Sequence, residues 1–234
     1  MKILSRESLP LGGFAGIVEH RLVTDSRVFG ERKKPETFEG LGNMVYLADA
    51  KYNPYGASGM HSHSEVDVIS IIIEGRVSHE GSMEHGKNLI AGDVQVQRAG
   101  GEGFSHNEIN PDNSKNRMLQ VWALPEEKGQ PASYKTYTPA DNGITRIYGG
   151  DKSQGITFDS HTLIDIVYLK AGESMAFEGK QLAYMITGNI GLSERIKQNT
   201  TNTFTMKEGD LVLSDNTQVT ATSDAHFLVV SYTQ

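Results

Sequence analysis

Short apolar runs recur along the whole chain and are separated by turn-forming residues, a pattern that predicts an all-β protein. Glycine supplies many of these breaks, with 25 residues among 234. No long segment shows a helical period, and the one short match, residues 193–197, covers less than two turns. The expected strands lie at residues 44–48, 66–73, 93–97, 118–124, 163–169, 182–186, 210–213 and 227–232.

A polar connector that contains several prolines and glycines divides the chain into halves of similar size. It spans residues 125–143, where no apolar run interrupts the turn-forming residues. We therefore expect two domains, an N-terminal one of residues 1–128 and a C-terminal one of residues 129–234.

The two halves also share a pattern of strands and turns. Residues 71–77, an apolar run that ends in a glycine turn at Gly75, are echoed by residues 184–190 around Gly188. A later Gly-Asp turn also occurs twice, at Gly92 and at Gly209. We interpret this repetition as an internal duplication of one β-domain.

Two short motifs in the first half contain residues that bind metals. His61 and His63 are two residues apart, and so are His106 and Glu108. Side chains two residues apart on a β-strand point to the same face, so each pair can converge on one point. Three imidazoles and one carboxylate are a donor set that divalent transition metals prefer. The sequence therefore predicts a metal site made by these four side chains.

The duplication provides an internal comparison for this site. When the shared glycine turns are aligned, none of the four candidate ligands has a ligand-type counterpart in the second half. The side chains that stand opposite them are Ser174, Ala176, Ser223 and Ala225. The fold does not require histidines at these places, which favours a functional role for them in the first half.

Other polar residues near the motifs have secondary roles in this interpretation. Asp67 is either a fifth ligand or an acceptor that orients a ligating histidine, and we favour the second because such histidines commonly need an orienting acceptor. His79 follows a predicted strand and is expected to be a loop residue or a neighbour of the site rather than a ligand.

Composition and charge exclude several classes of protein. The chain has no cysteine, which removes disulfides and thiolate chemistry. The net charge of -7 argues against direct binding to nucleic acid, because the densest basic cluster, residues 32–34, is flanked by glutamates. No apolar run approaches ~20 residues, so we expect no membrane span. Without a signal-like N-terminus, a cytoplasmic location is expected. Neither a nucleophile elbow nor a phosphate-binding glycine motif occurs.

The motifs together resemble those of the pirin family within the cupin superfamily. The matching features run from Gly59 and His61-Ser62-His63 through Ile73-Glu74-Gly75 and Ala91-Gly92-Asp93 to His106-Asn107-Glu108. The resemblance covers about residues 56–129, whereas the second half is similar only in architecture. Two features differ from the family: Asp67 replaces a glutamate, and the segment before Gly40 lacks a Trp- and Phe-rich opening.

The resemblance implies a bicupin, with two jelly-roll β-barrels in one chain and a metal ion in the N-terminal barrel only. It implies His61, His63, His106 and Glu108 as the ligands and iron(II) as the ion, although such donors also accept Mn, Co, Ni, Cu or Zn. Members of the family have been connected with flavonol (quercetin) 2,3-dioxygenase activity and with transcriptional co-regulation.

Three functions remain open at this point. An oxygenase would use the open positions of a six-coordinate ion for dioxygen and for a flavonol or another enolisable aromatic substrate, with Glu108 as the catalytic base. A non-enzymatic metal or redox sensor would act through a protein partner. A closed tetrahedral zinc site would be purely structural. The identity of the ion and its number of ligands separate these hypotheses.

Overall fold

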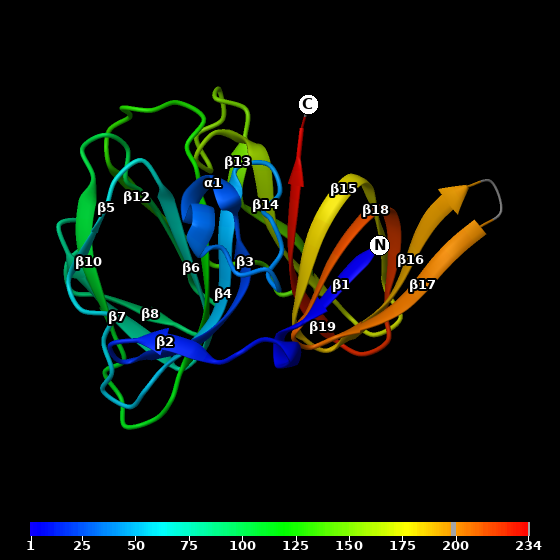
Figure 1. Cartoon of the computed structure of the whole chain (residues 1–234), viewed down its shortest axis with the longest axis horizontal. Coiled ribbons are helices and arrows are strands. Elements are labelled where there is room, and N and C mark those ends of the chain that lie inside the picture. The colour runs from blue at the N-terminus through cyan, green and yellow to red at the C-terminus, as the bar shows by residue number, and fades with distance from the viewer. Residues whose placement is uncertain (198–199, 234) are drawn as a thin grey trace. The chain divides into compact units, whose positions relative to one another are not determined.

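The structure is a computed structural model that describes residues 1–197 and 200–233 (Figure 1). The expectation of an all-β fold is confirmed. Among the described residues, helix is limited to α1 (Ser26–Phe29) and two 3-10 turns, η1 (Arg6–Ser8) and η2 (Gly30–Arg32). None of the helices in this part of the chain has the length and apolar character needed to cross a bilayer.

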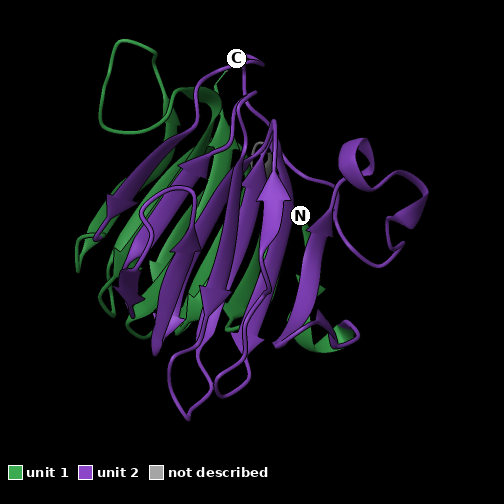
Figure 2. Ribbon diagram, turned by 90° about the vertical axis from the view of Figure 1, so that its left-hand side faces the viewer, with its two compact units in different colours: residues 1–8, 139–234 green, residues 9–138 purple. Residues whose placement is uncertain are grey.

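The chain divides into two compact units, which Figure 2 shows in different colours. The first unit along the sequence comprises residues 9–138, drawn purple and labelled unit 2 in Figure 2. The second comprises residues 1–8 together with residues 139–234, drawn green and labelled unit 1. The division falls after residue 138, and the first eight residues join the later half. The domain boundary between residues 128 and 129 stays a prediction.

The unit of residues 9–138 contains two antiparallel sheets. The larger sheet has the strand order β12-β9-β6-β11-β4-β3-β2. Its strands are β2 (Gly12–Phe14), β3 (Ile17–Thr24), β4 (Met44–Tyr52), β6 (Asp67–Glu74), β9 (Val94–Arg98), β11 (Arg117–Ala123) and β12 (Ser133–Tyr137). The smaller sheet has the order β5-β10-β7-β8. Its strands are β5 (His61–His63), β7 (Arg76–Gly81), β8 (Lys87–Ile90) and β10 (Phe104–Ile109).

Apolar side chains from both sheets form the core of this unit. Val77 and Leu89 of the smaller sheet pack in one buried cluster with Tyr52, Ile72 and Met118 of the larger sheet. Burial of these side chains holds the two sheets face to face. Strands β5 and β10, which carry the polar site described below, lie side by side at one edge of the smaller sheet (Figure 1).

The second unit is built on one large antiparallel sheet. Its order is β13-β14-β19-β15-β18-β16-β17, and β1 also pairs with β18. The strands are β1 (Lys2–Ser5), β13 (Gly143–Gly150), β14 (Ser160–Leu169), β15 (Ser174–Thr187), β16 (Asn189–Lys197), β17 (Thr200–Lys207), β18 (Asp210–Ala221) and β19 (Ala225–Tyr232). Its core contains Val167, Met185, Val212 and Phe227.

The glycines that the sequence comparison pairs adopt the same backbone conformation in both units. Gly75 and Gly188 have φ angles of 71° and 83°, and Gly92 and Gly209 have φ angles of 96° and 85°. These values lie in a region that side chains other than glycine rarely adopt. A Cβ at Gly188 would also approach the carbonyl oxygen of Asp224 to 2.1 Å. The repeated glycines therefore mark equivalent turns of a duplicated fold.

The short helical match at residues 193–197 is not a helix. These residues belong to β16, in which Ser193 pairs with Gln218 of β18 on one side and with Thr203 of β17 on the other. Ladder hydrogen bonds to two neighbouring strands outweigh a local pattern that spans little more than one turn.

Candidate metal centre

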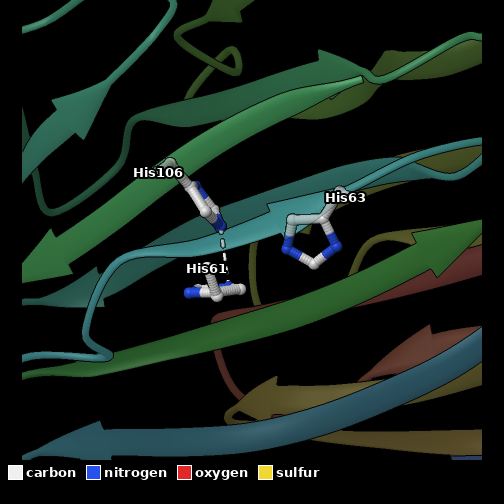
Figure 3. Close-up of side chains that lie close together, drawn as sticks. All are labelled: His61, His63 and His106. Atoms are coloured by element: carbon white, nitrogen blue, oxygen red, sulfur yellow. Dashed lines mark hydrogen bonds between the residues drawn. The ribbon is translucent and has the colours of Figure 1, made fainter. Parts of the chain in front are cut away.

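The three predicted histidines come together between two adjacent strands. Strands β5 and β10 pair antiparallel, and the register places His106 directly opposite His61 and Phe104 opposite His63. Because His61 and His63 lie two residues apart on β5, both side chains point to the face on which His106 lies. Figure 3 shows the three imidazoles converging from these two strands.

The distances between the imidazole nitrogens fit a single ion. One nitrogen from each of the three rings lies within 4.8 Å of the other two. The Nε2 atoms of His61 and His106 are 3.1 Å apart (Figure 3). Two nitrogens at right angles, each about 2.1 Å from one ion, are separated by about 3.0 Å. The observed spacing therefore matches two adjacent ligands of one transition-metal ion.

The available lone pairs also point to a metal site. Nδ1 of His61 lies 2.8 Å from the carbonyl oxygen of Gly59, and donation of its proton to this acceptor leaves Nε2 with a free lone pair. Nε2 of His63 is buried and has no hydrogen-bond partner. A buried polar atom without a partner is costly and rare, and an ion would satisfy this nitrogen.

The electrostatic surroundings keep the imidazoles of His63 and His106 neutral. Burial, reinforced by the neighbouring imidazoles of His106 and His61, lowers the pKa of His63 to about 4, although the charge of Glu108 partly opposes this shift. Burial and the rings of His61 and His79 lower the pKa of His106 to about 3. Neutral imidazole is the form that binds metals, so these two rings are in the ligand state at neutral pH.

Glu108 is buried on the same face of β10 as His106, and three donors hold its carboxylate. Ser70 Oγ and Gln95 Nε2 donate to Oε1 at 2.8 and 2.7 Å, and Tyr52 OH donates to Oε2 at 3.0 Å. An ionised carboxylate has about four acceptor positions, two on each oxygen. One position on Oε2 therefore remains, and the group of three nitrogens described above does not include this carboxylate.

Asp67 and His79 lie close to the site but are held by other contacts. Nε of Arg98 donates to Oδ2 of the fully buried Asp67 at 3.3 Å. His79 is buried in β7 rather than exposed in a loop, and its ring centroid lies 5.5 Å from that of His106. Its Nε2 faces Nε2 of Gln97 at 3.1 Å. His79 therefore supports the wall of the site.

A small cavity opens beside the three histidines. It encloses about 40 Å³, and its wall is mainly aromatic and aliphatic. The rings of Trp122 and Tyr46 pack with a centroid distance of 4.4 Å and a tilt of 31°. Phe29 of α1 stacks on both rings. Sequence analysis missed Glu19, Tyr52 and Gln120 in this wall, because they lie on strands of the larger sheet far from the histidine motifs.

The described residues of the second unit form no comparable cluster. Among the residues that the structure describes, the histidines of β5 and β10 form the one group of three or more His, Asp or Glu side chains with ligand atoms in metal-binding range. Ser174 and Ala176, the counterparts of the first histidine pair, lie exposed on β15.

One family model matches part of this chain. The family model that matches is Pirin, over residues 25–123. A quercetin 2,3-dioxygenase from Escherichia coli is 33% identical over 99 residues, which cover 42% of this chain and 42% of the relative. A pirin-like protein from Caulobacter vibrioides is 27% identical over 141 residues, which cover 57% of this chain and 60% of the relative. The chain thus matches less than two thirds of the length of each curated relative.

Among solved structures, a bacterial pirin from Escherichia coli in complex with nickel(II) matches the whole fold. Its TM-score is 0.81 at 19% identity, and the match covers 98% of this chain and 97% of the relative. At this identity the likeness establishes the fold, and the metal-binding residues must be argued from the geometry of this chain.

Proposed function

We propose that this chain is a pirin-like bicupin whose first unit binds one divalent transition-metal ion and uses it to oxygenate a small molecule. The observation that carries the proposal is the set of three converging imidazole nitrogens, one of which is buried without a hydrogen-bond partner. Packing alone does not explain this arrangement, because neutral imidazoles placed in a core normally have hydrogen-bond partners.

We propose His61, His63, His106 and Glu108 as the ligands and iron(II) as the native ion. Nickel(II), which is named with the related pirin structure, and Mn, Co, Cu or Zn are competing ions for the same donors. The remaining acceptor position on Oε2 of Glu108 supports its inclusion, since coordination through that oxygen preserves the hydrogen bonds from Tyr52, Ser70 and Gln95.

The surrounding residues have separate roles in the proposed reaction. A bound redox-active ion supplies Lewis-acid polarisation of an enol and electron transfer with dioxygen. Once released from the ion, Glu108 would accept the proton of the substrate hydroxyl at the freed position of Oε2, while the three donors keep the carboxylate in place. Tyr46 and Trp122 exclude water from the cavity beside the histidines.

A flavonol or another enolisable aromatic molecule is the proposed substrate, with dioxygen as the second reactant. Two features support this choice: the aromatic wall of the cavity and the sequence similarity to a protein named quercetin 2,3-dioxygenase. The test is oxygen consumption by the iron(II)-loaded protein with quercetin, together with elemental analysis of protein purified without chelators. The His61→Ala variant should lose both bound metal and oxygen consumption. A His161→Ala variant in the other unit is the control, and equal activity in both variants would refute the proposal.

A metal or redox sensor that acts through a protein partner is the second candidate. One observation favours it: the cavity of about 40 Å³ is smaller than the roughly 150 Å³ in which an engineered cavity binds benzene. Binding of one partner protein in only one oxidation state of the ion, without turnover of quercetin, would support this function over the oxygenase.

A further inference from the structure

A second, larger recess lies beside the metal cavity in the same unit. It encloses about 240 Å³. Its walls are formed by β3, by the segment that leads into β2 and by the loop that follows η2. The lining residues are Leu9, Pro10, Gly12, Gly13, Glu19, Arg21, Lys34, Glu36 and Thr37.

The two spaces share a wall at Glu19. This side chain lines both of them and is only 3% exposed. Its Oε2 accepts a hydrogen bond from Tyr46 OH at 2.9 Å, and Tyr46 lines the metal cavity. Its Oε1 accepts a hydrogen bond from Nε of Arg21 at 2.7 Å, and Arg21 lines the recess. The carboxylate is therefore the partition between the two spaces.

The metal cavity and the recess also adjoin at the hairpin of β2 and β3. Gly13 lines the recess, and Phe14, the next residue, lines the metal cavity. Gly12 pairs directly with Glu19 across the hairpin. Side chains at directly paired positions point to the same face of a sheet, so a side chain at residue 12 would point to the face that carries Glu19.

The two volumes together define which substrates can be accommodated. The metal cavity alone does not have room for an aromatic ring, whereas the recess exceeds the roughly 150 Å³ in which benzene binds. The recess has apolar surface from Leu9 and Pro10, and its cations, Arg21 and Lys34, are balanced by Glu19 and Glu36. Such a mixed, balanced lining suits an uncharged aryl group that carries hydroxyls.

We infer that this recess is a second substrate subsite, which receives the aryl group of a substrate whose enolisable end lies at the three histidines. The Glu19–Tyr46 hydrogen bond opens to admit the molecule. This inference rests on the proposed function and adds to it that the substrate has two parts, a small chelating head and an uncharged aromatic tail.

The test compares two ligands that share one head. Acetylacetone has the enolisable diketone alone, and benzoylacetone adds a phenyl group. Their affinities for cobalt(II)-loaded protein are measured by calorimetry for the wild type, Gly12→Phe and Gly155→Phe. A Cβ at Gly12 would make only ordinary contact, 3.7 Å from the Glu19 carbonyl oxygen, and one at Gly155, in the other unit, would contact nothing within 4 Å.

We expect the wild type to bind benzoylacetone at least tenfold more tightly than acetylacetone. Gly12→Phe should remove that advantage and leave acetylacetone affinity unchanged, and Gly155→Phe should change neither affinity. Tyr46→Phe, which removes the hydrogen bond between Tyr46 and Glu19, should raise benzoylacetone affinity severalfold. The subsite would be refuted if the wild type bound the two ligands with equal affinity, or if Gly12→Phe still bound benzoylacetone more tightly than acetylacetone by the wild-type factor. Absence of acetylacetone binding to metal-loaded wild type would instead refute the proposed function.

Discussion

The indole ring of Trp122 lies 5.7 Å from the imidazole ring of His63, with the two planes inclined by 70°. Trp122 is the only tryptophan of the chain, so its fluorescence reports on the metal cavity without background from other indoles. Paramagnetic ions quench an excited indole at such short range. We therefore expect cobalt(II) to quench the intrinsic fluorescence in a saturable titration and a chelator to restore it.

The same titration of two histidine variants shows where the ion binds. His63→Ala should abolish saturable quenching, whereas His161→Ala, on an exposed position of the second unit, should behave as the wild type. Saturable quenching of normal affinity in His63→Ala would show that the ion binds elsewhere.

Loss of a donor to Glu108 should weaken metal binding. Tyr52 is buried and donates to Oε2 of Glu108 at 3.0 Å. Tyr52→Phe removes this hydrogen bond, which holds the oxygen proposed to bind the ion. Removal of such an orienting group commonly lowers metal affinity about 10- to 100-fold. Competition of cobalt(II) between the protein and a chromophoric chelator measures the effect. Tyr168→Phe in the second unit is the control, and unchanged affinity in Tyr52→Phe would exclude Glu108 as a ligand.

A buried ion pair should dominate the stability of the larger sheet. Nη2 of Arg117 donates to Oδ2 of Asp49 at 2.7 Å, and the side chains are 3% and 1% exposed. Asp49→Asn removes one charge of this buried ion pair, which typically costs about 3–5 kcal/mol of unfolding free energy. Urea denaturation of metal-free protein measures this loss.

The exposed pair of Arg76 and Asp112 is the matched control for that measurement. Its N–O distance is also 2.7 Å, but both side chains are accessible to solvent. Water screens such a pair, so Asp112→Asn should leave the urea midpoint unchanged within error. Similar losses in the two variants would show that burial is not the cause.

Acidification should remove a contribution from Asp25, which caps α1. Burial alone would raise the pKa of Asp25, but hydrogen bonds from the Arg27 guanidinium and from the N–H groups of Arg27 and Gly40 hold it below 3.8. The ionised carboxylate therefore stabilises the fold above the unfolded-state pKa of about 3.9, and this contribution is lost as the pH falls through the folded-state value.

The corresponding measurement compares the wild type with Asp25→Ala at several pH values. At pH 7 the variant should lose about 1–2 kcal/mol of unfolding free energy, as for other helix caps. The difference should shrink steadily below pH 4, because the wild-type carboxyl is then protonated as well. A difference that does not change with pH would contradict this account.

The histidine cluster was predictable because its geometry follows from local rules. The two-residue spacing of His61 and His63 places both on one face of any extended segment, and their partner strand carries its own motif. The acceptor that orients His61 was not predictable, since it is the backbone carbonyl of Gly59 rather than an acidic side chain. Every residue has a backbone carbonyl, so no sequence pattern shows which one will accept the hydrogen bond that orients a ligating histidine.

Strand β3 and its contribution to the cavity were missed for a different reason. The alternation of Ile17, Glu19 and Arg21 breaks at an irregularity between Arg21 and Val23, so Leu22 and Val23 are both buried. A buried glutamate in such a segment also argues against a core strand until Tyr46 and Arg21 are seen to satisfy it. Those contacts are nonlocal, and only the folded chain reveals them.

The short strand β5 has a consequence for the dynamics of the first unit. Strand β5 is three residues long, lies at the edge of its sheet and pairs with β10 alone. So short an edge should open locally far more often than the central strands, and its amide protons should exchange quickly with deuterated solvent. Joining His61 and His63 to His106 through one ion would fasten that edge to its neighbour. If the ion slows amide exchange in β5 and β10 alone, the exchange rate of these amides measures how much of the site is occupied. This measurement needs no substrate.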